Sequence, residues 1–164
     1  MRIIGIDPGL SGAIAVLDDQ KVKCIFDMPV MSEGKKNKRQ LNSALLVSLL
    51  RENINSKEDT IIVVEQVNAM PGQGVTSMFN FGQTFGAIKG ISAALGLPIF
   101  FVRPAKWKKH FQLINSSKDA SRTKAIEMYP LLSGQLSKKK DVNKSDAILI
   151  ARFYSETRFD ENLK

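Results

Sequence analysis

The sequence predicts an α/β domain in which a five-stranded mixed sheet is flanked by helices. Three observations support this fold class. The first three strand-like runs follow one another through short links, the run Thr60–Glu65 is almost wholly apolar and β-branched, and helical patterns alternate with strands after it. Short links favour antiparallel neighbours, whereas strands joined through a helix favour parallel ones.

The antiparallel part is predicted as three strands: Arg2–Asp7, residues 12–17 and residues 21–28. A turn rich in Pro and Gly joins the first two, and the link 18–20 is short enough for a β-meander. The polar stretch 31–38 contains three lysines and predicts a mobile loop. Apolar spacing predicts a helix over residues 39–53.

The run Thr60–Glu65 suits a central strand that is buried on both faces. The later elements are predicted as a helix over 75–95, a strand over 98–102, helices over 105–111 and 118–128, a lysine-rich loop over 133–143 and a helix over 143–154. Because 164 residues suffice for one hydrophobic core, we expect a single domain over residues 1–158 and a short tail over 159–164.

The net charge of +8 is concentrated in one segment. Residues 100–144 contain eleven Lys and Arg against three Asp and Glu, and the rest of the chain contains thirteen of each sign. A localised basic field is typical of a protein that binds a polyanion, with nucleic acid as the leading candidate. A solvated charged surface is the plainer alternative.

The composition also bounds the cellular setting. Cys24 is the only cysteine, so an internal disulfide is excluded and a reducing compartment is expected. The apolar runs are too short for a membrane span, and the N-terminus lacks a signal pattern. We expect no membrane partner and a cytoplasmic location, or the cytoplasm of an organelle or host if the chain is organellar or phage-derived.

Three carboxylates stand at the ends of apolar runs. Asp7 ends the first predicted strand, Glu65 ends the fourth, and Asp146 directly precedes an apolar stretch of the last helix. A carboxylate beside a buried run is costly unless it is paired or binds a cation. Asp7 before Pro8 is alternatively a turn former, and Asp146 an acid favoured by the helix dipole.

Hard oxygen ligands without a Cys or His cluster favour Mg²⁺, with Mn²⁺ as a substitute. Two such ions per site would stabilise both the attacking water and the leaving 3′-oxygen of phosphodiester hydrolysis. If the first and fourth strands are neighbours, Asp7 and Glu65 face one another at the sheet edge, and the last helix brings Asp146 to the same edge.

Four ordered motifs resemble the RuvC-type Holliday junction resolvases of the RNase H-like superfamily. They are Gly5-Ile6-Asp7-Pro8-Gly9-Leu10-Ser11-Gly12, Val64-Glu65-Gln66, Gly74-Val75-Thr76-Ser77 with Phe81-Gly82-Gln83 and Gly86, and Lys144-Ser145-Asp146-Ala147 with Ile150-Ala151. The later segments Trp107-Lys108, Lys118-Asp119-Ala120-Ser121-Arg122 and Lys139-Lys140-Asp141 look closer to the monokaryotic chloroplast branch and related phage or bacterial forms.

The resemblance implies an RNase H-like fold, a homodimer, and symmetric Mg²⁺-dependent nicking of a four-way DNA junction. By motif position, Asp7, Glu65 and Asp146 would be metal ligands. A branch-migration motor is a possible further partner. The chain departs from the family at Asn143, three places before Asp146, where an acid or His is common. Asp141, five places before Asp146, matches the acid of the chloroplast-like branch, and this resemblance makes it our candidate for the fourth catalytic carboxylate and metal ligand, with a helix-capping or surface acid as the alternative.

A second departure concerns the aromatic residue three places after the catalytic Glu, which is Asn68 here. Met70 and Phe79 are the candidates for a wedge that enters the opened junction, although a core role is the favoured interpretation of Phe79. The glycines at 82, 86 and 90 predict a close backbone approach on the long helix. That face suits either a two-fold dimer, with Met78 and Phe85 exposed, or packing on the sheet.

Lys108 and Lys118 resemble the family's phosphate-binding or transition-state lysines, and we assign a catalytic role to Lys118. The candidate DNA-binding residues are Lys106, Lys108, Lys109, Arg122, Lys124, Lys138, Lys139 and Lys140. Three other functions stay open. They are an actin-like or sugar-kinase-like ATPase, for which one lobe is missing, an RNA-processing nuclease of the YqgF type, and a non-catalytic junction-binding protein.

Overall fold

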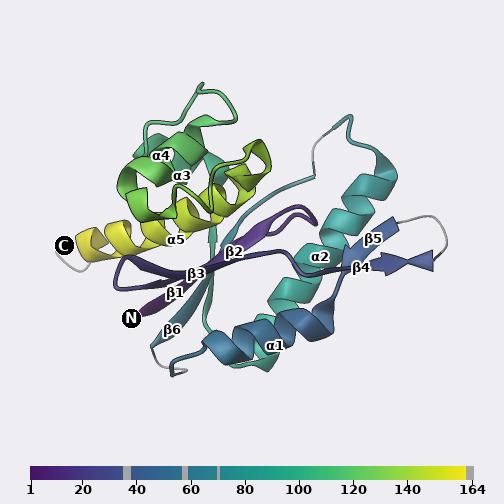
Figure 1. Ribbon diagram of the computed structural model, residues 1–164. Helices are drawn as coiled ribbons and strands as arrows, with labels where there is room; N and C mark the ends of the chain where they lie inside the picture. Colours follow the sequence, from purple (N-terminus) through teal and green to yellow (C-terminus); the bar gives the residue numbers. More distant parts are fainter. Residues whose placement is uncertain (35–37, 57–58, 70, 162–164) are drawn as a thin grey trace.

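The computed structural model describes residues 1–34, 38–56, 59–69 and 71–161. A five-stranded sheet has helices on both faces, and a separate two-stranded hairpin lies beside the longest helix of one face (Figure 1). Among the described residues, no helix is both long enough and apolar enough to cross a membrane.

The main sheet has the strand order β3-β2-β1-β6-β7. Its strands are β1 (Arg2–Asp7), β2 (Ala13–Asp18), β3 (Lys21–Asp27), β6 (Thr60–Glu65) and β7 (Ile99–Val102). Pairs β1–β2 and β2–β3 are antiparallel, whereas β1–β6 and β6–β7 are parallel. The predicted mixed five-stranded sheet is therefore confirmed, with a meander on one side and helix-connected strands on the other.

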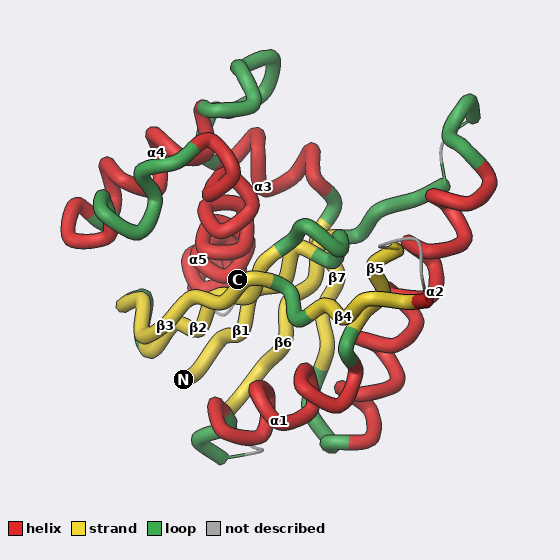
Figure 2. Tube along the Cα trace, turned by 45° about the vertical axis from the view of Figure 1, so that its right-hand side comes forward, coloured by secondary structure: helices red, strands yellow, loops and turns green. Residues whose placement is uncertain are grey.

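The helices form two layers (Figure 2). They are α1 (Ser43–Asn53), α2 (Val75–Ala94), α3 (Pro104–His110), α4 (Ala120–Met128) and α5 (Val142–Glu161), with short 3₁₀ turns η2 (Pro130–Leu132) and η3 (Lys139–Asp141). Helices α1 and α2 pack on one face of the sheet, and α3, α4 and α5 cover the other.

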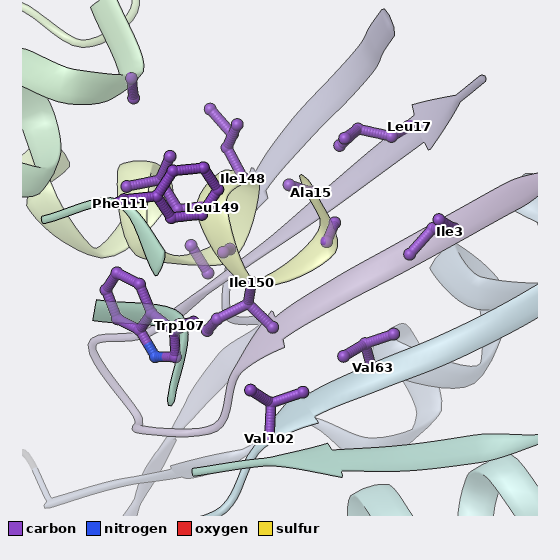
Figure 3. Packing of buried hydrophobic residues seen from close by; sticks show 14 of the residues in the cluster. Ile3, Ala15, Leu17, Val63, Val102, Trp107, Phe111, Ile148, Leu149 and Ile150 are labelled. Atoms are coloured by element: carbon purple, nitrogen blue, oxygen red, sulfur yellow. The ribbon is translucent and has the colours of Figure 1, made fainter. Parts of the chain in front are cut away.

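Alternation along the strands divides the core into two halves, because successive strand side chains point to opposite faces. Ile4 and Ile62 belong to the cluster under α1 and α2. Ile3 and Val63 belong to the cluster under α5, together with the fully buried Trp107 (Figure 3). By the same alternation, the strand ends Asp7 and Glu65 point to the α5 face.

The close packing of α5 on β1 depends on Gly5. A Cβ built at Gly5 would lie 2.3 Å from the carbonyl oxygen of Ala147 and 2.8 Å from the Cβ of Ala151. Any side chain at this position would displace the helix backbone, so the helix and the strand reach this distance only because residue 5 is glycine.

Two expectations for the first half of the chain were wrong. The stretch 31–38 contains strand residues of a hairpin, β4 (Val30–Glu33) with β5 (Lys38–Leu41), and residues 35–37 lie outside the described part. The stretch is polar, which hid these strands, and the core contact of the hairpin comes from Leu41 at the end of β5, beyond the stretch. Helix α1 begins at Ser43 rather than residue 39, since the Asn42 side chain accepts a capping hydrogen bond from the Leu45 amide at 3.0 Å.

The second half also departs from expectation. Helix α5 begins at Val142 and extends to Glu161, well past residue 154, so it enters the segment predicted as a tail. The lysine-rich loop contains the turn η3. On α2, a Cβ at Gly82, Gly86 or Gly90 would meet nothing within 4 Å, so no other backbone among the described residues approaches the glycine face.

Gly5→Ala is expected to destabilise the protein by about 2 kcal/mol or more, because the new methyl overlaps the α5 backbone. The measurement is the free energy of unfolding from urea denaturation. Gly134→Ala is the control, since its methyl meets open space and the φ of Gly134 is not positive, which predicts no loss of stability. Equal stability of Gly5→Ala and wild type would contradict the packing argument.

Candidate functional site

The parallel pairing of β1 and β6 brings two of the predicted carboxylates together. The register aligns Ile6 with Val64, so the next residues along, Asp7 and Glu65, occupy equivalent positions at the carboxyl ends of neighbouring strands. Both point to the α5 face, and both are partly buried. The carboxyl edge of adjacent parallel strands is where ligand sites of open α/β sheets usually lie.

A tight turn after β1 holds Asp7 in place. The Gly12 amide donates to the Gly9 carbonyl at 2.8 Å, and the Gly9 amide donates to Asp7 Oδ1 at 3.4 Å. A Cβ at Gly12 would lie 2.1 Å from the Asp7 carbonyl oxygen, so this turn cannot accept a side chain there. Asp7 is therefore a turn residue as well as a strand end, and the two interpretations are compatible.

Asp146 reaches the same edge from α5. The helix begins at Val142 and has no acid in its first turn, so the favourable effect of the helix dipole does not explain Asp146. Burial raises the pKa of Asp146, and a side-chain hydrogen bond from Ser121 opposes this effect. Ser121 belongs to α4 and is 6% exposed. The Oδ1 atom of Asp146 is buried and has no hydrogen-bond partner among the described residues.

The three carboxylates are close enough to affect one another's ionisation. Burial, together with the negative charges of Glu65 and Asp146, raises the pKa of Asp7 to about 7. Burial also raises the pKa of Asp146 to about 6, with a contribution from the Glu65 charge. Burial raises the pKa of Glu65, which the Trp107 hydrogen bond and the Lys108 charge oppose. The site therefore concentrates negative charge that the protein compensates only in part.

Lys108 is the cation of this site. Its positive charge favours the ionised form of Asp7, Glu65 and Asp146. Lys108 also lines a pocket of about 350 Å³ beside Asp146, and Lys118 lines the same pocket. Its remaining walls come from Trp107, Leu113, Ser116, Ser117, Ser121, Val142 and Asn143. Two ammonium groups and three hydroxyls next to the carboxylates form a polar recess suited to an anionic group.

Asp141 is placed differently from the other predicted ligands. Its Oδ2 accepts from the Lys138 amide at 2.8 Å, its Oδ1 accepts from Lys144 Nζ at 3.2 Å, and it is 4% exposed. These contacts cap the turn before α5 and help to lower the pKa of Asp141, although burial opposes them. Asp141 contributes to none of the three raised carboxylate pKa values, so the geometry favours its capping alternative.

The predicted DNA-binding residues fall into two groups. Lys106, Lys109, Lys138, Lys139 and Lys140 are exposed around the α3–α5 layer. Arg122 is engaged instead: it pairs with Asp119 at 2.6 Å and donates to the carbonyls of Leu136 and Ser137. Lys124 pairs with Glu127 at 3.3 Å and lines a different pocket, next to His110 and Glu156.

The wedge candidates have separate outcomes. Phe79 is 64% exposed on α2, so the favoured core interpretation of Phe79 was wrong. An exposed aromatic near the start of α2 stays compatible with the wedge prediction. Met70 lies outside the described residues. Of the predicted dimer-face residues, Met78 and Phe85 are partly buried.

Among the described residues, no three His, Cys, Asp or Glu side chains are grouped so that they could hold a metal ion as they stand. The donor set nevertheless fits a hard cation. It consists of carboxylate oxygens, it includes the orphaned Asp146 Oδ1, and it lacks His and Cys. Mg²⁺ in particular is commonly held by one or two carboxylates, with water and substrate phosphate completing its shell.

Sequence reasoning missed two residues that shape the site. Trp107 donates its indole N–H to Glu65 Oε1 at 2.9 Å, although 42 residues separate them. Ser121 supports Asp146 from another helix. The sequence contains no periodicity or spacing that links either residue to a carboxylate. Both residues stand in motifs quoted for the family resemblance, but a site role was assigned only to their charged neighbours, Lys108 and Arg122.

The architecture is the RNase H-like fold. The structure of Thermus thermophilus RuvC aligns with a TM-score of 0.55 and 19% identity, covering 96% of this chain and 97% of that one. Thermus thermophilus RuvC in complex with Holliday junction substrate aligns with a TM-score of 0.52 and 18% identity over 96% of each chain. The fold thus resembles that of Thermus thermophilus RuvC. No family model and no curated protein sequence matches the chain.

The raised carboxylate pKa values predict how stability depends on pH without added metal. Folded Asp7 and Asp146 bind protons with pKa values of about 7 and 6, against 3.8 ordinarily. The folded state therefore holds more protons than the unfolded state between these values, and that stabilisation is lost as pH rises from about 4 to 7. The free energy of unfolding of Asp7→Asn minus that of wild type should therefore increase by about 1–2 kcal/mol between pH 4 and pH 8.

Urea denaturation in EDTA from pH 4 to pH 8 measures this difference. Asp18→Asn is the control of opposite sign, because Arg2 lowers the pKa of Asp18 and their ion pair stabilises the fold above that pKa. Asp18→Asn should therefore lose stability relative to wild type as pH rises. A pH-independent difference for Asp7→Asn would show that Asp7 ionises normally.

Proposed function

We propose that this protein is a structure-specific endodeoxyribonuclease that resolves four-way DNA junctions by metal-dependent phosphodiester hydrolysis. One observation supports this most strongly. Carboxylates from three separate elements, Asp7, Glu65 and Asp146, affect one another's ionisation at a single sheet edge beside Lys108. The fold that carries them resembles RuvC, one structure of which is a complex with a Holliday junction.

In this proposal Asp7, Glu65 and Asp146 hold Mg²⁺, or Mn²⁺ as a substitute, at two ions per site. When bound, such ions stabilise the attacking water and the leaving 3′-oxygen. Two features support cation binding, namely the Asp146 Oδ1 without a hydrogen-bond partner among the described residues and the raised pKa of Asp7. A bound cation would give Asp146 Oδ1 a partner and would stabilise the ionised form of Asp7. Asp141 was also proposed as a ligand, but its hydrogen bonds to Lys138 and Lys144 support a capping role.

The basic residues divide the remaining work. Lys108, next to the three carboxylates, and Lys118, across the recess, would place positive charge near the scissile phosphate. The exposed lysines of α3 and of the segment before α5 would neutralise flanking phosphates. Binding should then weaken steeply with salt, as phosphate contacts release counterions.

A homodimer would give two such sites related by a two-fold axis, as symmetric nicking of a four-way junction requires. Helix α2 offers the surface for it. Val75 and Phe79 are 85% and 64% exposed, and the three glycines leave an open path on the same helix. A helix this apolar is normally covered on all sides, which supports a second copy of the chain as its cover.

The finer assignment to the chloroplast-like and phage-like branch is supported by sequence motifs alone, namely Trp107-Lys108, Lys118–Arg122 and Lys139-Lys140-Asp141. The same site chemistry would serve an RNA-processing nuclease of the YqgF type, and a non-catalytic junction-binding protein would need only the basic surface. A branch-migration motor remains a possible partner. Substrate choice and metal dependence separate these functions.

The deciding experiment offers the protein a mobile four-way DNA junction, together with duplex, flap, Y-shaped DNA and structured RNA. We expect paired symmetric nicks on the junction only, and only with Mg²⁺ or Mn²⁺. Asp7→Asn, Glu65→Gln and Asp146→Asn should each lower the cleavage rate by about 100-fold or more while junction binding persists, because they remove catalytic charge rather than the basic surface.

Asp141→Asn is the matched control within the same segment. It should lower stability by about 1–2 kcal/mol through the lost cap and leave the single-turnover cleavage rate within a few-fold of wild type. Full activity of Asp7→Asn would refute the metal-site proposal. Junction binding without cleavage under either cation would favour the non-catalytic function, and cleavage of RNA alone the YqgF-type function.

The dimer proposal predicts that Phe79→Glu gives a monomer, because a buried unpaired charge at the interface is costly. Sedimentation equilibrium measures the change in association. Leu131→Glu is the control, since Leu131 is 98% exposed on the opposite layer and should leave the dimer intact. A wild-type monomer at micromolar concentration, or a dimer of Phe79→Glu, would exclude α2 as the interface.

A further inference from the structure

We propose that Trp107 is a positioning residue that sets the orientation of Glu65 for cation binding through its indole N–H. The proposal deepens the function proposed above and depends on it, since it takes Glu65 as a cation ligand. Its basis is the hydrogen bond from Trp107 Nε1 to Glu65 Oε1 at 2.9 Å.

Trp107 is unusual in being wholly buried and polar at one end. Its ring is 0% exposed and packs among the α5-face residues, including Val102 and Ile150 (Figure 3). A buried indole N–H needs an acceptor, and the acceptor here is a site carboxylate rather than a backbone carbonyl. The core therefore holds the donor rigidly, and the donor holds Glu65.

The hydrogen bond distinguishes the two Glu65 oxygens. Oε1 accepts from the indole, and Oε2 receives no hydrogen bond from any described residue. An indole N–H can only donate, so it engages the carboxylate in its charged form and never competes with a cation for the free oxygen. A carboxylate fixed through one oxygen presents the other in a single direction.

The same side chain also orients Lys108. The Lys108 Nζ lies 5.3 Å from the centroid of the Trp107 ring, within the range of a cation–π contact. The charge of Lys108 lowers the pKa of all three carboxylates. The Trp107 ring therefore positions Lys108, while the Trp107 N–H positions Glu65. A phenylalanine at position 107 would retain an aromatic ring in the core but would lose the N–H that Glu65 accepts.

The chain contains one tryptophan, which makes a clean test possible. Biosynthetic replacement with β-(benzothiophen-3-yl)alanine exchanges only the indole N–H of Trp107 for sulfur and preserves the ring shape. The probe is Mn²⁺ alone, with free Mn²⁺ counted by electron paramagnetic resonance. We expect the Mn²⁺ affinity to fall about tenfold or more, as it does when the supporting partner of a ligand is removed.

Two controls separate orientation from packing. Phe111→Leu perturbs the same core cluster without touching Glu65, so it should lower the unfolding temperature and leave the Mn²⁺ affinity unchanged. In a Glu65→Gln background the sulfur isostere should change the Mn²⁺ affinity by no more than about twofold, because the oxygen that it orients is no longer a charged ligand. Trp107→Phe is a genetically encoded second variant with the same expectation as the isostere.

A direct readout of the bond is the single indole cross-peak in a ¹H–¹⁵N spectrum, which should move upfield in Glu65→Ala and shift when Mg²⁺ is added to wild type. The outcomes are distinguishable. No Mn²⁺ or Mg²⁺ binding by wild type would refute the proposed function itself. Wild-type binding with equal affinity in the isostere, or an equal loss in Phe111→Leu, would overturn the role of Trp107 and leave the proposed function standing.

Discussion

The close packing of α5 against β1 at Gly5 is the constraint on which the rest of the site depends. The Ala147 carbonyl occupies the space where a side chain at position 5 would be. Asp146 precedes that contact on the helix, and Asp7 lies two residues beyond it on the same face of the strand. The parallel neighbour β6 adds Glu65 at the equivalent position. The missing side chain at position 5 thus lets α5 bring Asp146 to the edge where Asp7 and Glu65 lie.

That convergence is energetically unfavourable in itself, and the surrounding residues compensate it only in part. Burial and like charge raise the pKa of Asp7 to about 7 and that of Asp146 to about 6. The Trp107 indole and the Lys108 ammonium oppose the same effect at Glu65. The unfavourable burial of carboxylates is confined to one edge of the sheet, whereas the two hydrophobic clusters are well buried. Such a local energetic penalty in an otherwise favourable fold is typical of a functional site.

The limits of prediction are clear at particular residues. Asp141 and Asp146 both precede apolar helical residues, and charge pattern alone does not distinguish them; the Lys138 amide and Lys144 use both oxygens of Asp141, whereas Asp146 Oδ1 has no partner among the described residues. Phe79 was expected in the core, yet its side chain is 64% exposed on α2. The β4–β5 hairpin was missed because most of its residues are polar and its core contact, Leu41, lies at its end.

The sequence by itself determined the strands of the main sheet, their mixed pairing and the three acids at element ends, because these depend on local periodicity and on the cost of a carboxylate beside an apolar run. Only the tertiary structure decided which groups meet those acids. Trp107 contacts Glu65 across 42 residues, and Ser121 supports Asp146 from a different helix. Such contacts arise where layers pack, and packing partners are set by the whole fold rather than by any segment of the chain.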